Sequence, residues 1–140
     1  MLPINLLAVI FAAVATFIIG FLAHGPVAGK LWMKLANIHP TGNEKMSDMY
    51  GKMIWNFVVN LVTAYVLAIV YLFASTSPLF GGAGIYTGIH TALLVWFGFI
   101  VTSSSIAVIW MGQSIKLWLF ECAASLVAFV AMGIIIALVK

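Results

Sequence analysis

Four long apolar stretches dominate this chain and restrict what it can fold into. They run over residues 4–23, 50–74, 84–110 and 115–139. Each reaches the ~20 apolar residues that an α-helix needs to cross a bilayer. Because lipid offers no hydrogen-bond partner to an exposed backbone, such segments are helices rather than strands. The sequence therefore predicts an all-α integral membrane protein with a single four-helix transmembrane domain over residues 1–140.

Composition excludes a soluble fold. Charged residues make up 6% of the chain and hydrophobic residues 65%, whereas a soluble domain carries about 25% charged residues. Six basic and three acidic side chains cannot cover a surface that faces water. The small basic excess contains no Arg, which favours a role in membrane orientation over nucleic-acid binding. We expect the lipid bilayer to be the main partner and expect no nucleic acid.

The first apolar stretch is expected to be a retained span. No Lys or Arg precedes it in Met1–Asn5, so the basic region of a signal peptide is missing. The run from Leu6 to Ala23 is also longer than the ~7–15 residues of a signal core.

The distribution of lysines predicts the orientation. Cytoplasmic loops of membrane proteins carry an excess of Lys and Arg. On the other predicted side, only Lys140 is charged. The bias places both termini outside and residues 24–52 in the cytoplasm, in a multi-pass protein of the inner (plasma) membrane. The lysines on the predicted cytoplasmic side are Lys30, Lys34, Lys45, Lys52 and Lys116.

The segment between the first two spans has a pattern of its own. In a helix over residues 26–37, Lys30 and Lys34 would lie on a different face from most of the apolar side chains. This pattern predicts a short cytoplasmic amphipathic helix lying in the membrane interface. Thr41–Glu44 has the form of a capping box, so the second spanning helix is expected to begin near Gly42. Ser47 is a competing start.

Residues 24–35 also carry a family signature. Gly25-Pro26, Gly29-Lys30 and Trp32-Met33 resemble the hallmark of an uncharacterised bacterial family of small four-span membrane proteins, the domain of unknown function numbered seventeen sixty-one. The four-span layout is similar over the whole chain. Family members usually have aromatic residues just before the Pro, where this chain has Ala23-His24. The resemblance implies a fold and carries no established activity.

Small residues recur every fourth position in two of the predicted spans. Such ridges allow helices to approach closely. They can serve packing within one bundle or a contact with a second protein, and the sequence leaves both open. The first ridge comprises Ala8, Ala12, Thr16 and Gly20, and the second Gly84, Gly88 and Ala92.

Polar residues at membrane depth are the candidate functional residues, because each is costly unless it has a partner. Glu121 is the only acid predicted inside a span. We expect it to share the cytoplasmic half of the bundle with several other polar groups. One hypothesis is a hydrated vestibule in which Glu121 binds a cation or exchanges a proton. The other is that Glu121 is neutral, or hydrogen-bonded to Asn or Ser, and only holds helices together. The remaining members of this expected cluster are Asn56, Asn60, Thr102, Ser105 and His24.

The other chemically active residue types give weaker signals. His90 could relay protons with Glu121 or be a packing residue. His24, His39 and His90 lie on different segments without ligand spacing, so we expect no metal site. Cys122, in an apolar run, is expected to be an inert core thiol. No hydrolase, zinc-protease or nucleotide-binding motif occurs, so we expect neither an enzyme nor a cofactor.

Three functions fit these patterns. The favoured one is an oligomeric channel or transporter-like protein that uses the polar cluster around Glu121. Four short helices are too few to enclose a pore, so this function implies a homo-oligomer. The second is a non-catalytic accessory or scaffold subunit that binds another membrane protein through the small-residue ridges. The third is a lipid-modifying enzyme that depends on Cys122 or His90.

Overall fold

The computed structural model describes residues 4–40 and 46–139, which form helices and connecting turns without a strand. Four helical stretches are long and apolar enough to cross a membrane: Leu6–His24, Met49–Thr76, Ile85–Met111 and Ile115–Leu138. The predicted all-α fold with four candidate spans is confirmed. The helices are α1 (Leu6–His24), α2 (Gly29–Ala36), α3 (Met46–Thr76), η1 (Pro78–Phe80), α4 (Ile85–Val95), η2 (Trp96–Val101), α5 (Thr102–Met111) and α6 (Ile115–Leu138).

The first residues of α3 can be compared with the two starts predicted for the second spanning helix. The predicted capping box at Thr41–Glu44 and the predicted start near Gly42 lie outside the described residues. Within them, α3 begins at Met46, and Ser47 belongs to its first turn.

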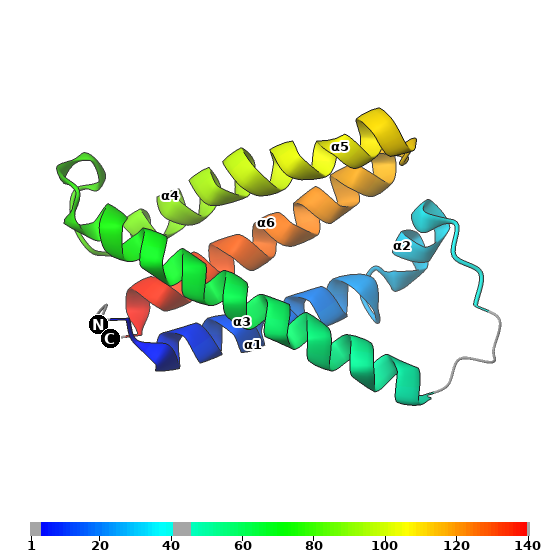
Figure 1. Ribbon diagram of the computed structural model, residues 1–140, viewed down its shortest axis with the longest axis horizontal. Helices are drawn as coiled ribbons and strands as arrows, with labels where there is room; N and C mark the ends of the chain where they lie inside the picture. Colours follow the sequence, from blue (N-terminus) through cyan, green and yellow to red (C-terminus); the bar gives the residue numbers. More distant parts are fainter. Residues whose placement is uncertain (1–3, 41–45, 140) are drawn as a thin grey trace.

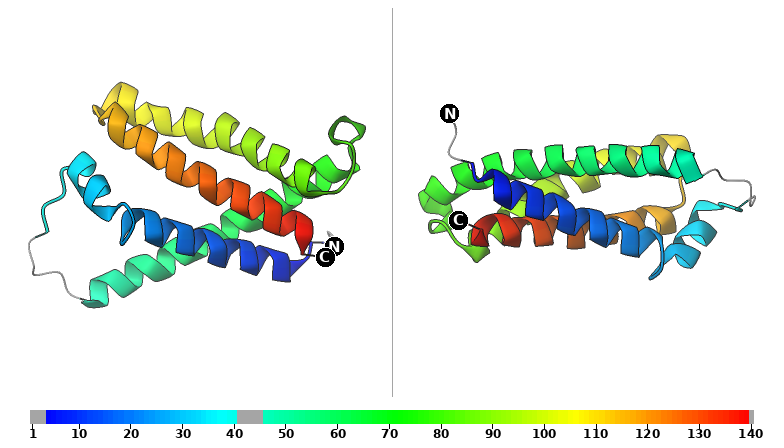
Figure 2. Two further views of the ribbon diagram at one scale, coloured as in Figure 1. Left: turned by 180° about the vertical axis from the view of Figure 1, so that it is seen from behind. Right: turned by 90° about the horizontal axis from the view of Figure 1, so that it is seen from below.

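The long helices form a layer with one helix crossing it. Helix α6 lies between α1 and the continuous rod of α4, η2 and α5, while α3 crosses one face of this layer (Figures 1 and 2). The side chain of Asn5 caps α1 by accepting from the backbone N–H groups of Leu7 and Ala8. Its Nδ2 also donates to the Val139 carbonyl at 3.4 Å, which ties the start of α1 to the end of α6. Helix α2 lies at the opposite end, against α1 and α6.

The core is narrow and is built largely from small residues. Ala12, Ala64 and Ala92 have no exposed surface, and Leu67 and Met132 are the largest side chains that are fully buried. Small side chains let helix backbones approach closely where packing replaces the hydrophobic effect. Most other large apolar side chains point outward, as expected for a surface that faces lipid. The core therefore lies where α3 crosses α1, α4 and α6.

The third span is interrupted by a π-helical segment that the sequence did not predict. Residues Trp96–Val101 form η2, and the helix is α-helical on either side. The Trp96 indole N–H donates to Ser125 Oγ of α6 at 3.0 Å. Because a π turn holds one extra residue, it changes which side chains face the neighbouring helix.

Candidate functional site

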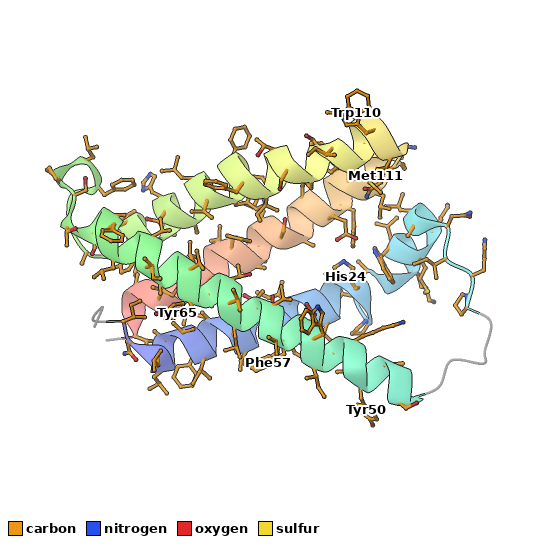
Figure 3. The ribbon with its side chains drawn as sticks, viewed as in Figure 1. His24, Tyr50, Phe57, Tyr65, Trp110 and Met111 are labelled. Atoms are coloured by element: carbon orange, nitrogen blue, oxygen red, sulfur yellow. The ribbon has the colours of Figure 1, made fainter. Side chains whose placement is uncertain are left out.

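Three side chains from three helices meet at the α2 end of the bundle. His24 is the last residue of α1, Trp32 lies on α2 and Glu121 lies on α6. His24 Nε2 is 3.0 Å from Glu121 Oε2, and the Trp32 indole N–H donates to Glu121 Oε1 at 2.9 Å. Each carboxyl oxygen of Glu121 therefore has its own nitrogen partner. Figure 3 shows His24 at the end of α1 nearest α2, pointing toward α6.

The hydrogen-bond geometry fixes one proton of this pair and leaves two possible positions for a second. His24 Nδ1 lies 2.9 Å from the Gly20 carbonyl oxygen. A carbonyl oxygen only accepts, so Nδ1 carries a hydrogen. The bond between Nε2 and Glu121 then needs one further proton, which sits on the imidazole or on the carboxyl group. The pair can hold this proton in either place, as an imidazolium with a carboxylate or as two neutral groups.

Aromatic rings hold the imidazole in place. The ring of His24 lies edge-on to the ring of Trp32, with centroids 5.2 Å apart. It also lies edge-on to Phe120, at 5.8 Å. Edge-to-face contacts of this kind stabilise ring orientation. The side chains of His24 and Glu121 nevertheless keep 33% and 40% of their surface exposed, so the pair can be reached from outside the protein.

The glycines of the sequence signature build the turn that brings Trp32 to Glu121. A Cβ on Gly25 would lie 2.6 Å from the Phe21 carbonyl oxygen, and one on Gly29 would lie 2.8 Å from the His24 carbonyl oxygen. The Gly29 N–H donates to the Gly25 carbonyl at 2.9 Å and closes the turn. A larger residue at either position would force the backbone apart, because real Cβ atoms do not approach so closely. The turn lets α2 fold back against α6.

The pair opens onto a cavity of about 560 Å³ between α1, α3 and α6. We call it the site cavity. Its size lies within the range of small-molecule sites, which are mostly apolar with a few placed polar groups. The amides of Asn56 and Asn60 have no hydrogen-bond partner among the described residues. The polar residues that line the site cavity are Thr16, His24, Asn56, Asn60, Thr63, Glu121 and Ser125.

The structure thus brings together part of the predicted polar cluster. His24, Asn56, Asn60 and Glu121 all line the site cavity. The expectation that Asn or Ser would bond Glu121 is wrong, because its partners are His24 and Trp32. Sequence reasoning missed the second partner entirely. Only the position of Trp32 in the family signature could have drawn attention to it.

Other predicted residues lie elsewhere. Thr102 Oγ1 and Ser105 Oγ donate to carbonyls of their own helix, each at 2.6 Å, and neither lines the site cavity. His90 is exposed on α4, with Nδ1 2.8 Å from the Tyr86 carbonyl oxygen. It does not line the site cavity either. Cys122 is a buried free thiol.

The two small-residue ridges face the interior of the protomer. Ala8, Ala12 and Thr16 are buried in the bundle, while Gly20 lines the site cavity. On α4, Ala92 has no exposed surface.

Gly84 and Gly88 complete the second ridge. The Gly84 N–H donates to Tyr71 Oη at 3.1 Å. A Cβ on Gly88 would overlap the carbonyl oxygen of Gly133 on α6. Most of both ridges is therefore occupied by contacts within one chain, whereas a Cβ on Gly20 or Gly84 would meet nothing within 4 Å.

The residues that could bind a metal are too few in one place. Among residues 4–40 and 46–139, no group of three or more His, Cys, Asp or Glu side chains gathers. The pair of His24 and Glu121 supplies two such groups, and the nitrogen partners already engage both carboxyl oxygens. This arrangement suits proton exchange, or a cation that accepts few ligands, better than a tightly held metal ion.

Comparison with known proteins identifies a family. The sequence model of the family described as "Protein of unknown function (DUF1761)" matches residues 7–137. This match confirms the resemblance carried by Gly25-Pro26, Gly29-Lys30 and Trp32-Met33. No curated protein and no solved structure matches the chain.

Proposed function

We propose that this chain, which belongs to the DUF1761 family, is a small membrane transport protein that binds a proton or a small cation at Glu121 and His24. The observation that carries this proposal is the carboxyl group of Glu121, which is 40% exposed and lines a cavity inside a bundle of spanning helices. Ionisable groups in spanning segments are costly and typically mark ion or proton pathways.

The pairing of the two residues supports a role in proton exchange. A single proton lies between His24 Nε2 and Glu121 Oε2, which are 3.0 Å apart. Arrival of a second proton would leave an imidazolium beside a neutral carboxylic acid, and arrival of another cation would displace the shared proton. Binding at the pair is therefore coupled to protonation.

The competing hypothesis makes the pair a structural link between α1, α2 and α6. Two hydrogen bonds to Glu121 support that hypothesis as well. A structural link, however, has no need for a cavity of about 560 Å³ beside it. Nor does it need the buried Thr16 hydroxyl in the cavity lining to lack a partner within the described residues, because buried polar groups normally find one. The cavity and the Thr16 hydroxyl favour a bound solute.

The two other functions have less support. A scaffold protein was inferred from the small-residue ridges, yet Ala12 and Gly88 pack inside the protomer. A lipid-modifying enzyme was tied to Cys122 or His90, but the thiol is buried in α6 and the imidazole lies exposed on α4. The proposed transport needs binding and translocation and no covalent step.

Flux through reconstituted liposomes tests the proposal. Purified protein is incorporated into vesicles that contain a pH-sensitive dye, and a potassium gradient with valinomycin drives protons inward. We expect flux above that of protein-free vesicles, and we expect Glu121→Gln to abolish it. The substitution keeps an acceptor for Trp32 while removing the ionisable group, so the fold should be retained. Sodium and potassium fluxes are measured in parallel.

A matched control separates this effect from a general loss of charge. Lys116→Gln changes an exposed charge on the same helix and should leave flux unchanged. Equal flux from the wild type and Glu121→Gln would contradict the proposal, as would the absence of wild-type flux for all three ions.

A further inference from the structure

A second cavity lies at the other end of the same three helices. It has a volume of about 640 Å³, and we call it the terminal cavity. Its lining includes Asn5 and Ala8 of α1, Ala68 and Tyr71 of α3, and Ile136 of α6. The site cavity is lined by the same three helices, nearer α2. The two cavities therefore lie at opposite ends of the bundle, and α1, α3 and α6 line both.

The partition between the cavities is thin. Along α1 it extends from Thr16, in the site cavity, to Ala8, in the terminal cavity, which is ~12 Å at 1.5 Å per residue. Along α6 it extends from Met132 to Ile136, or ~6 Å. A bilayer core is about 30 Å thick. The partition is therefore much shorter than the bilayer core.

The partition consists of the most deeply buried residues of the chain. Ala12 and Ala64 have no exposed surface, and Leu67 and Met132 are exposed by only 2% and 1%. All four belong to one contiguous buried cluster. The cluster joins α1, α3 and α6, and Figure 1 shows α3 crossing the layer that contains α1 and α6. None of the four side chains can carry a proton, so nothing crosses the partition while it is closed.

One polar atom at the partition lacks a partner. Thr16 Oγ1 is buried and has no hydrogen bond within the described residues, and Thr16 lines the site cavity. A buried hydroxyl without a partner is unfavourable, and a water or solute in the cavity would supply one. Thr91 Oγ1 is in the same situation, but Thr91 lines neither cavity.

We propose that the transported proton or cation passes through a single protomer, from the site cavity to the terminal cavity, and that Leu67 and Met132 form the gate between them. This inference rests on the proposed function. It makes the protein a transporter that must open a closed partition, rather than a continuous pore. Transport through one protomer would not need the pore between protomers that the sequence analysis expected.

Sided labelling of single cysteines tests the path without measuring flux. Each cysteine is introduced into a Cys122→Ser background and treated with a membrane-impermeant maleimide from one side of sealed vesicles. Asn60→Cys should react from the α2 side, and Leu72→Cys, which lines the terminal cavity, should react only from the opposite side. Leu67→Cys should react from neither. Reaction of both cavity positions from one side, or of neither from any side, would overturn the path.

Flux through gate variants tests the same path by function. Leu67→Ala and Met132→Ala remove side-chain volume from the partition. We expect proton flux to rise on the order of tenfold, as a barrier to gate opening lowered by about 1.4 kcal/mol would give. Val66→Ala and Val127→Ala are the matched controls, since both side chains point outward from α3 and α6. A path between protomers would reverse this pattern, with the outward positions altering flux and the gate positions leaving it unchanged.

The two proposals fail in different ways. If Glu121→Gln abolishes flux while the gate variants change nothing, transport stands and the path is wrong. If wild-type flux is absent, transport is wrong, and the labelling pattern still decides whether the two cavities open to opposite sides. A variant that does not fold is detected by gel filtration in detergent, and the labelling of Asn60→Cys and Leu72→Cys then decides the path.

Discussion

At the scale of single residues, the carboxyl group of Glu121 is held from two directions. His24 approaches one oxygen and Trp32 the other. The imidazole can gain and lose a proton, whereas the indole N–H is always a donor and cannot change state. Trp32 is therefore a positioning residue that fixes the direction in which Glu121 faces the cavity. This gives the Trp of the family signature a physical role.

Removing only the indole N–H tests that role. Trp32→Phe keeps an aromatic ring beside His24 and deletes the donor to Glu121 Oε1. We expect a loss of about 1 kcal/mol in the free energy of unfolding, because the bond is partly exposed to solvent. Unfolding by SDS in mixed micelles measures the change. Trp55→Phe is the control, since Trp55 is 71% exposed, and equal losses in the two variants would contradict the assignment.

Sequence could select the residues of this site but not pair them. Glu121 and His24 stand out because polar groups at membrane depth are rare. Their partnership joins positions 97 residues apart, and that of Trp32 with Glu121 joins positions 89 apart. No periodicity connects such positions. The pairing depends on how α2 folds back on the bundle, which follows from tertiary packing alone.

At the scale of elements, α4 and α6 approach each other closely at a pair of glycines. A Cβ on Gly88 would overlap the Gly133 carbonyl oxygen, and a Cβ on Gly133 would overlap that of Gly88. Each glycine therefore allows the other helix to approach. We expect Gly88→Ala to lower the free energy of unfolding by about 1–3 kcal/mol, because the backbones must move apart.

A second glycine supplies the control for this prediction. Gly51 lies in α3, where a Cβ would meet nothing within 4 Å. Gly51→Ala should be neutral or stabilising by up to about 1 kcal/mol, since alanine has the higher helix propensity. SDS unfolding of both variants is the measurement. A Gly88→Ala variant as stable as the wild type would show that the crossing is looser than the structure indicates.

The elements themselves were largely predictable, with one exception. Long apolar stretches must become helices in lipid, so the four spans follow directly from composition. The π segment of Trp96–Val101 does not, because nothing in an apolar run distinguishes a π turn from an α turn. The prediction for Thr102 and Ser105 rests on their depth in the span, and depth does not determine which face of a helix a side chain occupies. Their hydroxyls bond carbonyls of the same span instead.

At the scale of the whole molecule, the two ends of the bundle differ in charge, and both carry exposed aromatic side chains. Exposed Trp55 and Trp110 lie toward the α2 end, and exposed Tyr86 lies at the other. Figure 3 shows Tyr50 and Trp110 on the outside of the bundle near the α2 end. Aromatic side chains concentrate at both faces of a membrane. The described lysines Lys30, Lys34, Lys52 and Lys116 all lie toward the α2 end.

This asymmetry predicts that the site cavity opens toward the cytoplasm. His39→Cys, after α2, and Leu79→Cys, between α3 and α4, are exposed positions at opposite ends. Neither substitution removes a lysine. In a Cys122→Ser background, an impermeant maleimide added to intact cells should label only Leu79→Cys, and permeabilised cells should label both. The physical reason is that loops rich in Lys are retained on the cytoplasmic side.

The reverse labelling pattern would place Glu121 near the outer surface. Under the proposed function, the pair of His24 and Glu121 would then exchange protons with the outside rather than with the cytoplasm. Because the partition at Leu67 and Met132 is closed, the orientation determines which compartment the pair of His24 and Glu121 samples first. With the α2 end in the cytoplasm, the proposed transport would load the pair from the cytoplasm and release the cargo through the terminal cavity once the gate opens.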